Sequence, residues 1–327
     1  CGYRAEAAPL AANVPAAKEP TPEPTEAPVF TVEYRLGDDV LKAESVPFGG
    51  ATAADAALPE GLRLIAWTEE TGARVDPAAP VEADAVYYAL VRPVRREDAV
   101  FLFPDENGLL RPESAMTHAE CAAALRALAP EERLAPALLA SLDAAPGDVL
   151  TCEELKTALD ALFDPEAVEP ALEALPATES EHATRAEFAY SVSHLLGKEG
   201  AAEDVYYPDV APSHWAASEL LAAAGSGTLT KDALVSMTRD GFLWFGGYLY
   251  RLDENGYFLT DTEFDGLYFD KNGRYTSGNE ELDGFVAQTL SDFMTPDASR
   301  LDDLKTIYYH VKNDFQYLPR NYYDSGA

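Results

Sequence analysis

The chain has 327 residues and carries 57 acidic against 24 basic residues, a formal net charge of −33. Such an excess of negative charge repels nucleic acids and anionic membrane surfaces, so we expect neither as a partner. No apolar run reaches the roughly 18 residues of a membrane-spanning helix, and the length predicts two or three domains.

The three cysteines, Cys1, Cys121 and Cys152, are too few and too scattered for a disulfide framework or a zinc site. Cys121 and Cys152 lie beside helical patterns and are interpreted as small buried residues. We therefore predict no metal and no cofactor.

The N-terminal segment, residues 1–28, begins with Cys1 and continues into a stretch with six prolines and few large apolar side chains. Such a stretch predicts an extended spacer. A cysteine followed by a polar tether resembles the mature N-terminus of bacterial lipoproteins. The resemblance implies a lipid on Cys1 and an extracellular position in the cell envelope, anchored on the outer face of the cytoplasmic membrane. A fragment boundary that falls on a cysteine is the alternative.

Residues 29–92 predict a small β module, because Val32 and Tyr34 alternate with polar residues before a turn at residues 37–39. The segments VPFGG, LPEGLRLIAW and PVEADAVYYA resemble the internalin-type B repeat, which is β-grasp-like. The resemblance implies a spacer or adhesion element on a cell surface. Trp67 is interpreted as a core residue.

Residues 93–237 predict helices that begin after four threonines, Thr117, Thr151, Thr184 and Thr230. Their spacings of 34, 33 and 46 residues indicate internal repeats. In the first three, a glutamate stands three residues later and predicts a capping box; these are Glu120, Glu154 and Glu187.

Two further patterns flank these boxes. Phe103-Pro104-Asp105 precedes the first box, and residues 207–210 (YPDV) and 214–216 (HWA) follow the third. With the TRAE sequence at residues 184–187, they resemble surface-layer homology (SLH) repeats. This resemblance implies a helical trefoil whose grooves bind a secondary cell-wall polysaccharide, often pyruvylated, or peptidoglycan.

By this resemblance, polymer binding is assigned to Arg185, Asp209 and Trp215. An arginine suits an anionic polymer because its planar fork pairs with a carboxylate at two points. The other boxes depart from the pattern, with His118, Cys152 and Lys231 where arginine is expected. A scaffold that keeps the fold but has lost most binding is an equal alternative.

Residues 238–285 contain two copies of the pattern D-x-N-G, at residues 253–256 and 270–273. Asn-Gly favours a type I′ turn, and the flanking aromatic residues favour cross-strand pairs, so two hairpins are predicted. They resemble the cell-wall-binding hairpin repeats of glucan- and choline-binding proteins. Capture of a quaternary ammonium by a tyrosine cage and a plain β spacer are the two interpretations.

Residues 286–327 predict a helix, in which Leu304, Ile307 and Val311 follow the helical period. The segment resembles the first helix of bacterial transglutaminase-like domains, whose papain-like Cys-His-Asp group lies downstream. No cysteine follows residue 152. We therefore expect a truncated chain that stops before its catalytic residues.

Together these patterns predict an α+β multidomain fold: a β-grasp-like module, SLH-like helical repeats, β-hairpin repeats and a stray C-terminal helix. The predicted function is a set of non-catalytic surface modules that anchor to the bacterial cell wall or present a transglutaminase-like domain there. A purely adhesive or wall-polysaccharide-binding protein is the alternative. No phosphate-binding loop, HExxH motif or nucleophile elbow occurs, so no enzyme is expected within this chain.

Overall fold

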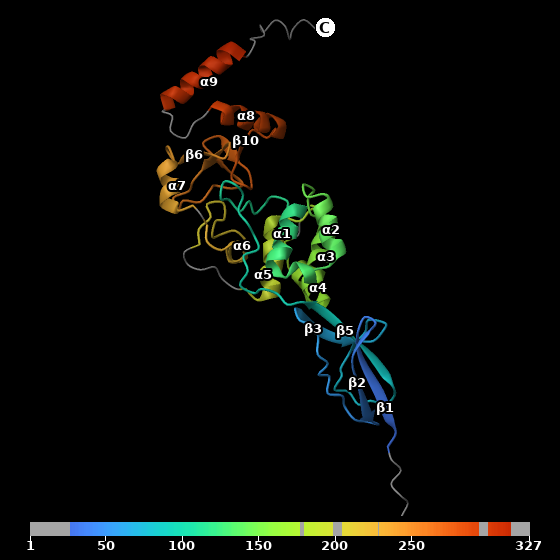
Figure 1. The fold of residues 1–327 in the computed structure, drawn as a ribbon. Helices are drawn as coiled ribbons and strands as arrows, with labels where there is room; N and C mark the ends of the chain where they lie inside the picture. The colour runs from blue at the N-terminus through green and yellow to red at the C-terminus, as the bar shows by residue number, and fades with distance from the viewer. Residues whose placement is uncertain (1–26, 177–179, 199–204, 228, 294–299, 315–327) are drawn as a thin grey trace, which may run out of the picture. The chain divides into compact units, whose positions relative to one another are not determined.

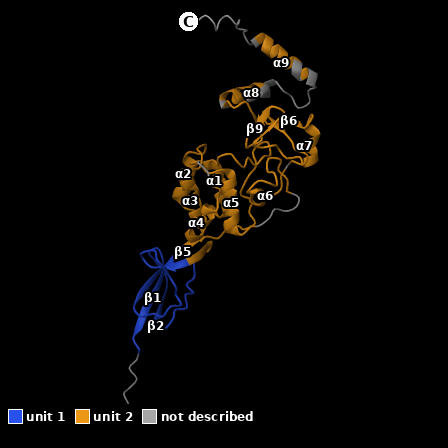
Figure 2. Ribbon diagram, turned by 180° about the vertical axis from the view of Figure 1, so that it is seen from behind, with its two compact units in different colours: residues 1–58, 66–90 blue, residues 59–65, 91–327 orange. Residues whose placement is uncertain are grey.

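The computed structural model describes residues 27–176, 180–198, 205–227, 229–293 and 300–314. Helices and several small sheets occur together, so the fold is mixed α and β, as predicted (Figure 1). The chain divides into two compact units, Cys1–Leu58 with Ala66–Leu90, and Pro59–Ile65 with Val91–Ala327 (Figure 2). The predicted lipid site Cys1 and most of its tether lie outside the described residues.

One five-stranded sheet is built from the N-terminal strands, which are β1 (Val29–Leu36), β2 (Asp39–Pro47), β3 (Leu62–Thr68), β4 (Arg74–Val75) and β5 (Ala85–Pro93). Its strand order is β2-β1-β5-β3-β4. The predicted turn joins β1 and β2 as an antiparallel hairpin, and β5 then pairs with β1 in parallel.

Tyr34 lies at the centre of the core of this first unit. Its ring centroid is 4.7 Å from that of Trp67 and 5.7 Å from that of Tyr87. The Tyr34 hydroxyl donates to Thr52. Trp67 is 3% exposed, which confirms the prediction that it is a core residue.

Three pairs of helices contribute to one larger hydrophobic core in the second unit. The pairs are α1 (His118–Leu128) with α2 (Pro136–Ala144), α3 (Cys152–Leu162) with α4 (Pro165–Glu173), and α5 (Arg185–Leu196) with α6 (Ala217–Ala224). A short 3₁₀ helix, η1 (Glu131–Arg133), lies between α1 and α2. Cys121 is buried in this core as predicted, whereas Cys152, the first residue of α3, is exposed, so the prediction that it is buried is wrong.

All three predicted capping boxes are formed. Thr117, Thr151 and Thr184 each accept the N–H of the glutamate three residues later, and that glutamate accepts the threonine N–H in return. Because both bonds are local, the helix starts follow directly from the sequence.

The residues that precede these threonines close the repeats into a ring. The N–H of Met116 donates to the carbonyl of Ala183 at 2.9 Å, that of Leu150 to Met116 at 2.7 Å, and that of Ala183 to Leu150 at 2.8 Å. Each repeat thus donates to one neighbour and accepts from the other, so the hydrogen-bond pattern has threefold symmetry. The ring places the N-termini of α1, α3 and α5 around one centre.

The fourth predicted repeat does not belong to this ring. Thr230 caps α7 (Lys231–Met237) through the N–H of Ala233. Ala233 stands where the other three boxes have their glutamate, so the reciprocal bond is absent. Leu234 packs into a second core with Leu243 and Tyr250 of the hairpins. The helical repeats therefore number three, and α7 belongs with the hairpin region.

The hairpin region forms two small sheets. The first sheet consists of β6 (Phe242–Phe245) and β7 (Tyr248–Arg251). The second contains β8 (Thr262–Phe264), β9 (Leu267–Phe269) and β10 (Tyr275–Thr276), with the strand order β10-β9-β8. The two D-x-N-G segments make turns after β7 and between β9 and β10. The predicted type I′ geometry is wrong, because positive φ occurs at Gly256 and Gly273 but not at the preceding asparagines.

An aspartate organises each of these turns, and the same turn occurs a third time at residues 105–108. The Oδ1 atoms of Asp105, Asp253 and Asp270 each accept the N–H groups two and four residues further on, at 2.8–2.9 Å. The glycine three residues after each aspartate adopts φ between +74° and +83°. The segment that sequence analysis compared with an SLH half-repeat therefore has the same turn geometry as the hairpins.

The C-terminal described helices are α8 (Glu280–Phe293) and α9 (Arg300–Asp314). The predicted C-terminal helix coincides with α9, whereas the predicted boundary at residue 286 falls inside α8. Tyr308, Tyr309 and Val311 of α9 are more than half exposed. No helix in the described part of the chain has the length and apolar character required to cross a bilayer.

Candidate functional site

Arg185, the first predicted polymer-binding residue, lies inside the protein. It is 4% exposed. Its Nε donates to the carbonyl of Leu110 at 2.6 Å, and its two terminal nitrogens donate to the carbonyl of Phe103 and the carboxylate of Glu120. The guanidinium therefore faces acceptors of the chain itself and not a groove open to a polymer. This geometry makes Arg185 a structural residue.

The equivalent positions of the other two boxes make similar contacts. The Nε2 atom of His118 lies 3.2 Å from Oε2 of Glu154. Cys152 lies near Glu187, whose charge adds to the effect of burial and raises the pKa of the thiol. In two of the boxes, the residue after the threonine thus contacts the capping glutamate of another repeat, whereas the thiol of Cys152 donates to the carbonyl of Ser180 at 3.8 Å.

Asp209, the second predicted residue, is almost completely buried, with 5% exposed. Its Oδ2 accepts the N–H of Arg111 at 2.6 Å, while its Oδ1 has no hydrogen-bond partner. Burial raises the pKa of Asp209, although the N–H groups of Arg111 and Leu110 oppose this effect. The guanidinium of Arg111 is directed elsewhere, to Asp105 and to the hydroxyl of Tyr250.

Trp215, the third predicted residue, presents an aromatic face to solvent. It is 41% exposed. Its ring stacks on His214 with centroids 5.8 Å apart, and it also contacts the ring of Tyr190 at 5.4 Å. Of the three predicted residues, Trp215 is the most accessible to a ligand.

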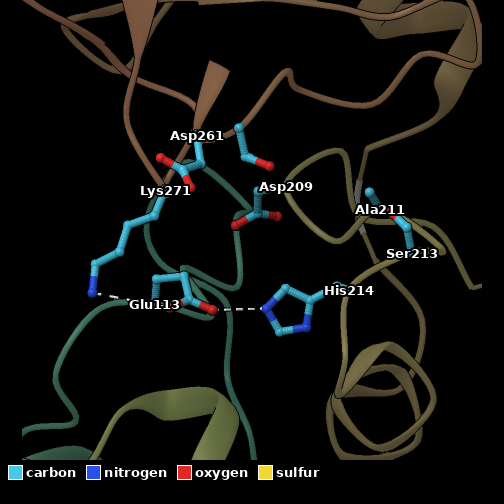
Figure 3. A pocket seen from close by; sticks show the side chains of 8 residues that line it. Glu113, Asp209, Ala211, Ser213, His214, Asp261 and Lys271 are labelled. Atoms are coloured by element: carbon cyan, nitrogen blue, oxygen red, sulfur yellow. Dashed lines mark hydrogen bonds and ion pairs between the residues drawn. The ribbon is translucent and has the colours of Figure 1, made fainter. Parts of the chain in front are cut away.

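Beside His214 lies a polar cleft of about 380 Å³ (Figure 3). Its lining residues come from the loop before α1, from the segment before α6 and from the hairpin region; they are Glu113, Asp209, Ala211, Ser213, His214, Thr260, Asp261 and Lys271. Two hydrogen bonds tie the hairpin region to the segment before α6: Phe258 N–H to Pro208 carbonyl at 2.8 Å, and Tyr206 hydroxyl to Gly256 carbonyl at 2.5 Å.

Glu113 lies at the centre of this cleft, between His214 and Lys271 (Figure 3). Its Oε1 is 2.9 Å from Nε2 of His214, and its Oε2 is 3.9 Å from Nζ of Lys271. The hydrogen bond from His214 is the main cause that lowers the pKa of Glu113, with smaller contributions from Lys271 and Trp215. Glu113 is therefore an ionised carboxylate at neutral pH.

The tautomer of His214 follows from its second hydrogen bond. Its Nδ1 lies 3.1 Å from the backbone N of Ala216 and can only accept that N–H. Nε2 therefore carries the ring proton and donates it to Glu113. Since both nitrogens are engaged, His214 has no free position from which to activate Ser213 as a nucleophile.

The described residues contain no other group with the features of a catalytic or metal centre. No cluster of three or more His, Cys, Asp or Glu side chains is suited to hold a metal ion there. Burial raises the pKa of the Cys121 thiol to about 12 and that of Cys152 as well, so neither is an activated thiolate. The groups in the cleft are suited to binding.

The aromatic residues of the hairpins surround cations of the chain itself. The guanidinium carbon of Arg251 lies 4.7 Å from the ring centroid of Phe242 and 4.1 Å from that of Phe264. The guanidinium of Arg274 lies 4.2 Å from that of Tyr248. These arginines occupy the faces that would form a cage, which favours the spacer interpretation of the hairpins.

Comparisons with protein-family models, with curated proteins and with solved structures each find no match to this chain.

The predicted and observed sites overlap only in part. The structure places Asp209 in the cleft and Trp215 beside it, whereas Arg185 is buried and does not line the cleft. Sequence analysis missed Glu113 and Lys271. Glu113 follows Pro112 in a segment without a distinctive pattern, and Lys271 occupies an ordinary turn position, so neither carries a signal that could have identified it.

Proposed function

We propose that this chain is a non-catalytic module of the bacterial cell envelope that binds a wall saccharide, from a secondary cell-wall polysaccharide or peptidoglycan. The observation that carries the proposal is the polar cleft around Glu113 with the exposed ring of Trp215 next to it. A carboxylate that accepts sugar hydroxyls and a flat aromatic face are the two kinds of group that a pyranose ring requires.

The closed ring of three helix pairs supports this proposal. It is the arrangement expected of a helical trefoil, which the resemblance to SLH repeats implies. The sequence resemblance of residues 29–92 to an internalin-type B repeat supports a position on the cell surface. In this proposal, that sheet and the hairpins act as spacers, and ligand binding belongs to the cleft.

A pull-down on purified wall glycan tests the function. We expect wild-type protein to be retained and Trp215→Ala to lose at least tenfold in affinity, because the aromatic platform contributes stacking and buried area. Tyr309→Ala removes an aromatic side chain of similar exposure on α9 and serves as the matched control. Equal retention of wild type and Trp215→Ala would contradict the proposal.

A lipid anchor on Cys1 is the proposed means of attachment outside the cell. Mass spectrometry of the mature N-terminus tests it, since a thioether-linked lipid on Cys1 adds a defined mass. An unmodified Cys1 on protein isolated from membranes would exclude this anchor.

Presentation of a transglutaminase-like domain is the second candidate function. It is favoured by α9, whose exposed Tyr308, Tyr309 and Val311 form a face able to pack against another folded body. Sequencing of the coding region after codon 327 tests it. Absence of a cysteine, a histidine and an aspartate in a following domain would leave saccharide binding as the sole proposal.

A further inference from the structure

The charge of the cleft is negative. Its lining includes three carboxylates, those of Glu113, Asp209 and Asp261, against the single ammonium of Lys271. His214 directs its Nε2 at the carboxylate of Glu113 and accepts the Ala216 N–H at its Nδ1, so its ring is engaged within the chain. The net charge of −33 on the chain has the same sign. An anionic glycan would be repelled both at long range and within the cleft.

Asp209 is the second, independent observation. It lines the cleft, it is 95% buried, and its Oδ1 has no hydrogen-bond partner. A buried carboxylate that lacks compensation costs free energy, and a positive charge brought close to it recovers part of this cost. Arg111 supplies a backbone N–H to Asp209 but directs its guanidinium to Asp105 and Tyr250. The carboxylate of Asp209 therefore lacks a cationic side chain directed at its free oxygen.

Lys271 does not supply this missing cation, because its side chain is only loosely held. Its side chain is 61% exposed, and its Nζ lies 3.9 Å from Oε2 of Glu113. Exposed pairs of this kind contribute little stability. Because Oε1 of Glu113 is fixed by His214, Oε2 is the oxygen that an incoming cation meets, and the cation can displace the Lys271 ammonium from it.

We propose that the cleft binds a hexosamine residue with a free ammonium group, with the ammonium near Glu113 and Asp209 and the sugar ring near Trp215. The proposal rests on the proposed saccharide function and narrows its ligand. The hydroxyl groups of Ser213 and Thr260 in the lining provide partners for ring hydroxyls. They and the aromatic face favour an amino sugar over the aliphatic amine of a lysine side chain. This amino sugar replaces the anionic polysaccharide that the SLH resemblance implies as the ligand.

Titration calorimetry of the full chain at pH 6 tests the inference with three oligosaccharides of equal length. The first is a glucosamine tetramer with free amines, the second is the same tetramer with every nitrogen acetylated, and the third is an acetylated tetramer that carries carboxylates. We expect the free-amine tetramer to bind at least tenfold more tightly than the other two, because acetylation removes the charge.

Three variants locate the contact. Glu113→Gln keeps the acceptor for His214 and should weaken binding of the free-amine tetramer at least tenfold. Glu254→Gln makes the same change on an exposed turn residue outside the cleft and should leave binding unchanged. Lys271→Gln removes the competing ammonium and should tighten binding severalfold, a gain that structural damage does not produce.

The outcomes separate this inference from the proposed function. Equal or tighter binding of the acetylated or acidic tetramer, or weaker binding by Lys271→Gln, would overturn the amino-sugar inference and leave saccharide binding intact. Failure of all three tetramers to bind, together with failure to retain the protein on wall glycan, would overturn both.

Discussion

At the scale of single residues, the position after each capping threonine shows how one site in a repeat can hold different side chains in the same place. Arg185 and His118 each contact the capping glutamate of another repeat, whereas Cys152 donates to a backbone carbonyl. The arginine makes the strongest of these contacts, because it is charged and also binds two carbonyls. Its place in a binding motif does not reveal this structural role, since the motif describes sequence and not burial.

Arg185→Ala should destabilise the protein by about 3–5 kcal/mol, because it leaves the carbonyls of Leu110 and Phe103 and the carboxylate of Glu120 without their donor. Urea unfolding measures this loss. Arg126→Ala is the matched control: Arg126 pairs with Asp143 at 2.6 Å but is 32% exposed, so about 1 kcal/mol or less is expected. Similar losses for both variants would show that Arg185 is not a structural residue.

Asp209 is expected to make stability depend on pH. Its pKa is raised in the folded state, so the folded form is favoured by protonation and loses stability as the pH rises above the unfolded value of about 3.9. Asp209→Asn cannot ionise and keeps an oxygen for the Arg111 N–H. The variant should therefore gain stability relative to wild type between pH 4 and pH 7, by about 1 kcal/mol or more.

Urea unfolding of wild type and Asp209→Asn at the two pH values checks this expectation. A difference in unfolding free energy that favours the variant more at pH 4 than at pH 7 would contradict the raised pKa.

At the scale of elements, the sequence predicts local structure well where the chemistry is local. The three capping boxes, which start α1, α3 and α5, and the hairpin of β1 with β2 follow from residues within a few positions of one another. The prediction of a type I′ turn is wrong because a carboxylate oxygen of Asp253 or Asp270 determines the conformation of each loop, and the Asn-Gly pair does not. The closed ring and the cleft depend on distant segments, which no local pattern specifies.

The ring predicts unequal effects for equivalent caps. Thr151→Ala loses the bond from Glu154 N–H and the hydroxyl contact to the Glu154 carboxylate, at a helix start bound to both other repeats. We expect a loss of about 1–2 kcal/mol in the free energy of unfolding. Thr230→Ala removes a single cap bond outside the ring and should cost less than half as much. Equal losses in thermal or urea unfolding would contradict the exclusion of α7 from the ring.

At the scale of the whole molecule, the charge and the cleft point to the same class of ligand. A chain with a net charge of −33 gains no long-range attraction for an acidic polymer. In the proposed function, specific binding comes from short-range contacts at Glu113, Asp209 and Trp215. The resemblance to SLH repeats identified two of these three candidate residues. It also named Arg185, which is buried, and it did not name Glu113, which tertiary packing brings into the cleft.

The most direct test of the central claim, that the cleft binds a wall saccharide, is a nuclear magnetic resonance titration of ¹⁵N-histidine-labelled protein with purified wall glycan fragments. The chain contains five histidines, so the labelled protein has few ring signals to assign. We expect the Nε2 signal of His214 to shift with saturation, because it donates to the carboxylate that meets the ligand, while His118 and His182 stay unchanged. An unchanged His214 signal at saturating glycan would contradict the proposed site.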